Sequence, residues 1–232
     1  LEGVVEAAPG VYPVTFTAKN SEGSASVTLS VRVNEKPVFK TQSLPDGSTL
    51  SEYKAEDGKD VQVVAEGLDV TFASEDLPAG LSLDAKTGVI SGTPSKGGVF
   101  AFTVTATNEL GSTDQQYAIE VSEPAAVSTQ SLAPVVAGQA YGQKIETTCY
   151  PAATVTVTGL PEGLSFDNNT NTISGTVAAD KVGSYQVTAE ADNQVGGKPA
   201  SKTFTLYVAS EPTINTASLQ DAVAGSKYSI DL

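Results

Sequence analysis

The sequence contains no histidine, tryptophan or methionine among its 232 residues, and it has only one cysteine, Cys149. Without histidine, neither a Ser–His nor a Cys–His catalytic pair can form, and the commonest general base is missing. A single cysteine excludes an internal disulfide and a cysteine-rich metal site. The acidic residues are scattered over predicted turns and imply no pocket, so we predict that the chain is not an enzyme.

Positive charge is also scarce, because 13 Lys and Arg residues stand against 27 Asp and Glu residues and the net charge is −14. A surface of this sign repels nucleic acid and anionic membranes, which excludes nucleic acid as a partner. No run approaches the ~20 apolar residues that cross a bilayer, so we expect no membrane insertion by this segment. The chain opens at Leu1 without a basic and apolar leader, and we expect it to be a fragment of a longer protein.

What the sequence does contain is an internal repeat. Residues 77–94 read LPAGLSLDAKTGVISGTP and residues 160–176 read LPEGLSFDNNTNTISGT, at an offset of 83. Other phrases recur at steps of 87 or 88 residues, including those that contain Pro37, Pro124 and Pro212. We therefore predict the end of one repeat at 1–34, complete repeats at 35–122 and 123–210, and the beginning of a further repeat at 211–232.

Hydrophobic residues alternate with polar ones near the end of each repeat, as in strands with one buried face. Asn and Gly residues at 20–23, 108–111 and 193–196 predict hairpins in which both residue types adopt positive φ. Shorter strands are expected near 37–40, 50–55, 61–65, 69–74, 81–84 and 88–91. About seven strands in each repeat favour a β-sandwich over a small barrel. The alternating positions are Tyr12, Val14, Phe16 and Ala18; Phe100, Phe102, Val104 and Ala106; and Tyr185, Val187, Ala189 and Ala191.

The repeated segment at 77–94 is interpreted as a structural corner. Gly80 permits a sharp reversal of the chain, Gly88 supplies positive φ in a tight loop, and Gly92 allows the backbone to approach a neighbour closely. In the second copy, the loop at residues 167–171 contains asparagines, and asparagine can replace the loop glycine, Gly88, in the left-handed conformation. Each role is architectural, so binding is expected elsewhere.

These motifs resemble the Ig-like repeats of bacterial surface proteins, of the He_PIG type, which are related to the cadherin-like modules of dystroglycan. The resemblance rests on the LPxGLS(L/F)D and ISGT phrases and on the G-x-(Y/F) strand that follows them. It implies an all-β fold of tandem immunoglobulin/cadherin-like β-sandwich domains on secreted or cell-surface bacterial proteins. It also implies a non-enzymatic stiff stalk or adhesion module. The alternative is a carbohydrate-binding accessory module of a secreted enzyme.

Cadherin-like modules often bind calcium between domains, and each predicted junction here carries a glutamate next to or near a proline. One glutamate per junction is too few for the 6–8 oxygens that calcium takes, unless loops of a neighbouring domain contribute. The other interpretation is a solvated acidic surface. The candidate calcium ligands are Glu35, Glu123, Glu211, Asp84 and Asp167.

Few aromatic rings are available to bind a glycan, because most occupy inward positions of the alternation. Tyr150, Tyr207 and Tyr53 are the candidates for exposed rings. The predicted partners are an unknown protein or glycan on a surface and the neighbouring repeats of the same chain. The partial repeats at 1–34 and 211–232 suggest a further partner, a second copy of the chain that associates end to end. Together the two partial repeats lack the middle of a repeat, so they would not complete a domain.

Overall fold

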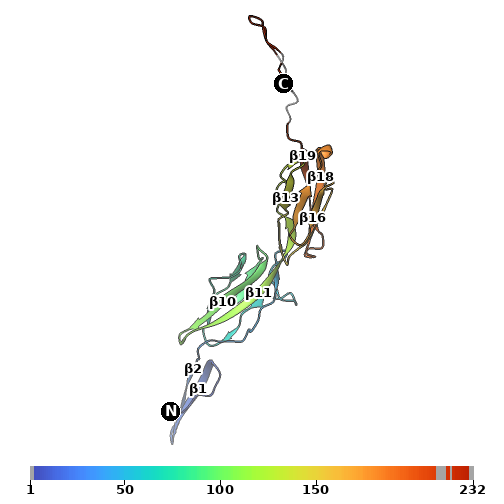
Figure 1. Cartoon of the computed structure of the whole chain (residues 1–232). Helices are drawn as coiled ribbons and strands as arrows, with labels where there is room; N and C mark the ends of the chain where they lie inside the picture. The colour runs from blue at the N-terminus through green and yellow to red at the C-terminus, as the bar shows by residue number, and fades with distance from the viewer. Residues whose placement is uncertain (1–2, 213–217, 220, 230–232) are drawn as a thin grey trace. The chain divides into compact units, whose positions relative to one another are not determined.

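The computed structural model describes residues 3–212, 218–219 and 221–229, and these residues form β-strands joined by turns (Figure 1). The chain divides into two compact units. The first comprises residues 1–125, 148–153 and 193–198, and the second comprises residues 126–147, 154–192 and 199–232. No helix in the described part of the chain has the length and apolar character needed to cross a membrane.

The first unit begins with a two-stranded hairpin of β1 (Gly10–Asn20) and β2 (Gly23–Val33), in which Tyr12 lies opposite Val31. The strands form where the alternation predicts them. The face predicted to be buried is instead exposed, since Tyr12 is 37% and Leu29 is 54% exposed. In the first complete repeat, residues from 39 to 90 cover the equivalent face.

One sheet of the first complete repeat is built on a long hairpin. Strand β10 (Gly98–Asn108) pairs antiparallel with β11 (Gly111–Val127) along its whole length. Strand β7 (Thr71–Ala73) pairs with the other edge of β10, while β14 (Thr147–Tyr150) and β4 (Gly47–Ser48) both pair with β11.

The facing sheet consists of short strands. Strand β9 (Val89–Gly92) lies between β5 (Val61–Gln62) and β8 (Leu81–Leu83), all antiparallel. Strand β3 (Val38–Phe39) pairs separately with β6 (Ala65–Glu66). Side chains from the two layers meet in one core, which confirms the predicted sandwich. Its buried members are Phe39, Tyr53, Val61, Val63, Phe72, Ile90, Phe102, Val104, Ala106, Tyr117, Ile119 and Val121.

Two of the predicted short strands differ from the structure. Residues 50–55 contribute only an isolated bridge between Lys54 and Asp60. The predicted strand at 61–65 is two strands, because β5 pairs with β9 while β6 pairs with β3. Residues 61–65 read VQVVA, a single mainly apolar stretch, and the change of partner within it leaves no mark on the hydrophobic pattern.

The second unit repeats this arrangement. One sheet has the order β12-β19-β18-β15 and the other has the order β13-β17-β16. A single turn of 3-10 helix, Ala179–Lys181, precedes β18. The strands are β12 (Val135–Val136), β13 (Ala140–Lys144), β15 (Thr154–Thr158), β16 (Leu164–Asp167), β17 (Thr172–Thr176), β18 (Gly183–Asp192) and β19 (Ala200–Ala209).

A parallel strand pair joins the early and late parts of each complete repeat. In the first, β4 runs parallel to β11, with Gly47 opposite Val121. In the second, β12 runs parallel to β19, with Val135 opposite Val208. The two long hairpins, the pairings of β7 and β15 with them, and the pairings of the short strands in the facing layers are antiparallel.

The signature glycines lie against each other. A Cβ atom on Gly92 would stand 2.1 Å from the carbonyl oxygen of Gly80, and one on Gly175 would stand 2.0 Å from that of Gly163. This close approach confirms the role predicted for Gly92. Gly88 has φ of 71°, as predicted, and the residue at its position in the second copy, Asn171, has φ of 53°.

The predicted beginning of a further repeat, 211–232, lies partly outside the described residues. No strand occurs in the part of 211–229 that the structure describes. A turn there nevertheless matches one in the second repeat. Ser226 N donates to Val223 O at 3.0 Å, as Gln139 N donates to Val136 O at 3.0 Å, with similar positive φ at the intervening glycines. The three boundaries between the four predicted segments stay a prediction.

Candidate functional site at the repeat junctions

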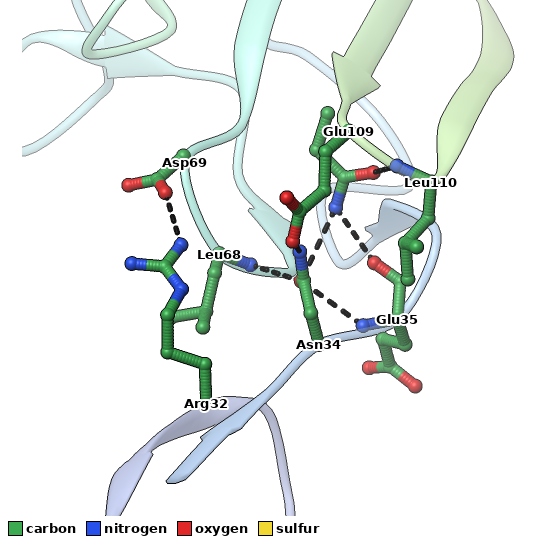
Figure 2. A network of polar contacts seen from close by, with 8 residues as sticks. Arg32, Asn34, Glu35, Leu68, Asp69, Glu109 and Leu110 are labelled. Atoms are coloured by element: carbon green, nitrogen blue, oxygen red, sulfur yellow. Dashed lines mark hydrogen bonds and ion pairs between the residues drawn. The ribbon is translucent and has the colours of Figure 1, made fainter. Parts of the chain in front are cut away.

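The first junction, where β2 leads into the first complete repeat, is held by two asparagine side chains (Figure 2). Asn108, in the β10–β11 turn, donates from Nδ2 to the carbonyl oxygen of Glu35 at 2.7 Å. The Oδ1 atom of Asn34 accepts from the backbone N–H groups of Leu68 at 2.8 Å and Glu35 at 3.0 Å. Three segments that lie far apart in the sequence therefore meet at residues 34–35.

Charged side chains flank this network. Asn34 Nδ2 donates to Glu109 Oε1 at 2.9 Å, and Arg32 pairs with Asp69 at 2.5 Å. The hydrogen bond to Asp69, and then the attraction of that carboxylate, raise the pKa of Arg32. The side chains of this ion pair are 51% and 78% exposed, so solvent screens it and it adds little stability.

The second junction, at residues 123–125, uses an asparagine in the same way, and all the atoms involved belong to the first unit. Asn193 Nδ2 donates to the carbonyl oxygens of Glu123 at 2.7 Å and Pro151 at 3.0 Å. Its Oδ1 accepts from the N–H of Ala125 at 3.0 Å. The carboxylate of Glu123 accepts from the N–H of Gly97 at 2.7 Å.

The structure does not bring the five candidate calcium ligands together. Glu35, Glu123 and Asp84 lie in the first unit, while Asp167 and Glu211 lie in the second. Glu123 is engaged by Gly97, and the exposed Glu211 accepts a long hydrogen bond of 3.5 Å from Gln139. Among the described residues, no three His, Cys, Asp or Glu side chains group so as to hold a metal ion. The calcium site stays a prediction without support from this arrangement.

The two aspartates instead organise their own loops. Asp84 Oδ1 accepts from the N–H groups of Lys86 at 2.9 Å and Thr87 at 2.8 Å, and these bonds, led by that of Thr87, lower its pKa. Asp167 accepts from the N–H of Asn169 at 2.9 Å and from Thr170, and its pKa is lowered for the same reason. Both roles follow from the Asx-turn predicted for this loop.

Of the three tyrosines proposed as exposed rings, only Tyr207 is exposed, at 61%. Tyr53 is 2% exposed, so that prediction is wrong. Its hydroxyl donates to the carbonyl of Pro45 at 2.7 Å, and burial raises its pKa. Tyr150 is partly buried and donates to Glu120 at 3.2 Å. Because Tyr150 and Tyr207 belong to different units, the structure assigns them no common site.

Sequence reasoning found the junctions but misassigned their asparagines. Asn108 and Asn193 do not have positive φ, which is taken by Gly111 in one turn and by Gln194, Gly196 and Gly197 in the other. The missed signal was the recurrence of asparagine, rather than glycine, at the first position of each turn. A residue needed only for positive φ is replaceable by glycine, whereas a side-chain amide is not.

Comparison with known proteins places the whole repeated region in one family. The sequence pattern of the family described as "Putative Ig domain" matches residues 36–122 and again residues 120–209. The serine-rich adhesin for platelets of Staphylococcus aureus strain MRSA252 is 34% identical over 163 residues, which are 68% of this chain and 12% of the adhesin. The adhesin of the same name from strain USA300 is 38% identical over 113 residues, or 46% of this chain and 5% of the adhesin.

Solved structures with similar folds are more distant. A titin fragment of domains I67–I69 is 17% identical with a TM-score of 0.44, covering 88% of this chain and 75% of the fragment. Titin domains A164–A165 are 13% identical with a TM-score of 0.47, covering 77% of this chain and 100% of that one. An endo-fucoidan hydrolase is 16% identical with a TM-score of 0.36, covering 88% of this chain and 34% of the hydrolase.

Proposed function

The chain belongs to this family of Ig domains, and on that premise we propose that it is a stiff stalk segment of a bacterial cell-surface or secreted adhesin. In this proposal, tandem Ig-like repeats act as non-enzymatic spacers that hold an adhesive region away from the cell. The observation that carries it is the double match to one domain family, together with identity to segments of staphylococcal adhesins. The chain spans at most 12% of those first relatives, so their adhesion to platelets is not transferred to this segment.

Two features of the repeats support a spacer. The junctions are short, and prolines at positions 37 and 124 restrict the backbone where one repeat leads to the next. The side chains around them bond to one another and to backbone, as expected of a segment that is ordered rather than free. The neighbouring repeats are thus the first partners that we propose for each domain.

Small-angle X-ray scattering of the whole chain tests the stalk. A compact globule of this length has a radius of gyration of about 17 Å. Repeats in series should give a value well above that, unchanged between dilute and concentrated samples. A radius near that of a compact globule would reject the stalk, and growth with concentration would point to end-to-end self-association instead.

Adhesion is tested separately with beads that carry this chain. A spacer should leave the beads without saturable binding to platelets or to a glycan array. Saturable binding would show that the segment itself makes the contact. Loss of glycan binding in Tyr207→Ala would then favour the carbohydrate-binding alternative, which no observation of the described residues favours over the stalk.

A further inference from the structure

Asparagine occupies the first position of the hairpin turn in all three copies, at residues 20, 108 and 193. In the first copy it serves only its own turn. Asn20 Oδ1 accepts from the N–H groups of Glu22 at 2.9 Å and Gly23 at 3.0 Å, and its amide nitrogen donates to no residue that the structure describes. The two complete repeats add a second function to the same side chain.

In the first complete repeat, both ends of the Asn108 amide are used. Oδ1 accepts from the N–H of Leu110 at 3.0 Å, which fixes the orientation of the amide. Nδ2 then donates to the carbonyl of Glu35 at 2.7 Å and to Oδ1 of Asn34 at 3.3 Å, both in the entering segment. The same Asn34 oxygen receives the N–H of Leu68, so the turn, the entering segment and a third loop are linked through one pair of amides.

The second complete repeat has the same contact with different neighbours. Asn193 Nδ2 donates to the carbonyl of Glu123, which lies 88 residues after Glu35, and Asn193 Oδ1 accepts from Ala125 on the far side of Pro124. Proline has no N–H, so Pro124 donates no backbone hydrogen bond at this point of the chain. Asn193 supplies a donor to the residue before Pro124 and an acceptor to the residue after it.

We propose that Asn108 and Asn193 are clamp residues, whose side-chain amides order the segment that enters each complete repeat without a bound cation. The proposal rests on the proposed stalk function, since ordered junctions are what a stiff stalk requires. A half-buried carbonyl left without its donor is costly, and the entering segment is expected to move away from the turn toward water when the amide is lost. The turn itself should survive, because it depends on Oδ1.

Asn108→Asp is the sharpest variant. It keeps the shape of the side chain and the oxygen that accepts from Leu110, and it replaces the Nδ2 donor with an oxygen that faces the carbonyl of Glu35 and the oxygen of Asn34. Asn20→Asp is the matched control, because it makes the same change of charge in an equivalent turn that has no clamp contact. Asn108→Ser, which removes the amide without adding charge, carries the test if Asn108→Asp does not fold.

The readout is the distance distribution between spin labels on the hairpin and on the first complete repeat. Labels at Ser30→Cys and Gln116→Cys, both at exposed strand positions, are attached in a Cys149→Ala background of the full chain. The distribution should be narrow in the parent and in Asn20→Asp, and at least about twice as wide in Asn108→Asp, as expected for a junction whose ordering bond is lost. Hydrogen exchange should stay slow at the Leu110 amide in Asn108→Asp, which keeps the oxygen that accepts from it, and should become about tenfold faster at Leu68 in the same variant.

Three results would overturn the proposal: an Asn108→Asp distribution as narrow as the parent, equal broadening in Asn20→Asp, or broadening of the parent by EDTA, which would transfer the ordering role to a cation. Failure of the clamp is distinguishable from failure of the stalk. An elongated particle by scattering with an unaffected junction in Asn108→Asp removes only the clamp, whereas a compact particle with a clamp-dependent junction removes only the stalk.

Discussion

In the first complete repeat, the carbonyl oxygen of Thr41 accepts a hydrogen bond from the hydroxyl of Tyr117 at 2.9 Å. In the second, the corresponding carbonyl of Thr129 accepts from the ammonium group of Lys202 at 2.5 Å. Both threonine hydroxyls also accept a backbone N–H, from Val64 at 2.9 Å and from Glu146 at 2.7 Å. The acceptor is therefore common to the two repeats, while the donor differs in chemistry and in position.

The register of the strands explains the exchange. Tyr117 lies opposite Phe102 in the first repeat, and Phe204 lies opposite Val187 at the equivalent place in the second. Phenylalanine has no hydroxyl, and the donor comes from two residues earlier on the same strand. The ammonium group of Lys202 also lies 5.6 Å from the centre of the Phe204 ring, a favourable cation–π arrangement. What the fold requires here is a donor to one carbonyl, not a particular residue.

The contact between the two glycines of the corner allows no such exchange, because glycine is required at both positions in both repeats. The largest expected effect is therefore from Gly92→Ala and Gly175→Ala, which should destabilise their repeats equally. Each adds a Cβ atom about 2 Å from a carbonyl oxygen at positive φ, at a cost on the order of 3 kcal/mol or more. Denaturant unfolding of each variant measures it.

Gly138→Ala is the control for this pair, because it has φ of 82° and open space around the added atom. It should cost about 1 kcal/mol from backbone conformation alone. If Gly92→Ala cost no more than this control, the reciprocal contact would have no energetic importance.

The next largest effect separates the repeats at one loop position. Gly88→Asn should destabilise the first repeat by about 2 kcal/mol, because its Cβ atom would lie 2.2 Å from the carbonyl oxygen of Val63. The reverse change, Asn171→Gly, should alter stability by less than about 1 kcal/mol. Glycine adopts the positive φ of this position readily, and the change removes a buried Oδ1 that has no hydrogen-bond partner. Equal costs for both substitutions, measured by denaturation, would show that the two loops are interchangeable.

Tyr117→Phe tests whether the donor to the threonine carbonyl is needed. We expect a loss of about 1 kcal/mol, and recovery of most of it in Tyr117→Phe with Gln115→Lys, because Gln115 stands where Lys202 stands in the second repeat. Burial raises the pKa of Tyr117 to about 12, so its hydroxyl remains a donor through neutral pH. Gln115→Lys alone is the control. If it stabilises the parent as much as it stabilises Tyr117→Phe, the lysine does not replace the lost donor, and the interpretation that one donor substitutes for the other is contradicted.

The smallest expected effect is on acid stability. The pKa values of Asp84 and Asp167 are lowered in the folded protein, mainly through N–H donors from Thr87 and Asn169 respectively. A lowered folded pKa gives stability that is present above the unfolded value of about 3.9 and is lost as pH falls through the folded value. Asp84→Asn and Asp167→Asn should therefore flatten the decline of the denaturation midpoint below pH 4. An unchanged decline in both variants would assign it to other carboxylates.

The hydrophobic alternation was sufficient to predict the long strands, the sandwich and the face of β10 that carries Phe102 and Val104. The repeated corner was predicted down to the positive φ of Gly88 and of its asparagine counterpart. The division of residues 61–65 into two strands was not predictable, because pairing partners are set by tertiary contacts. The asparagine contacts were missed for a related reason, since the turn was visible in the sequence but the carbonyl about 70 residues away was not.

The parallel pairing of β4 with β11 and of β12 with β19 has a mechanical consequence. In each complete repeat, a strand near the beginning runs alongside the strand near the end, in the same direction. A pull applied to the two ends of a repeat loads the hydrogen bonds of such a pair in shear, so that they share the force and must break together. An antiparallel pair pulled apart from one end would open one bond at a time. A repeat stretched from its two ends would thus be held in part by these short strands, although each forms only two residue pairs with its neighbour.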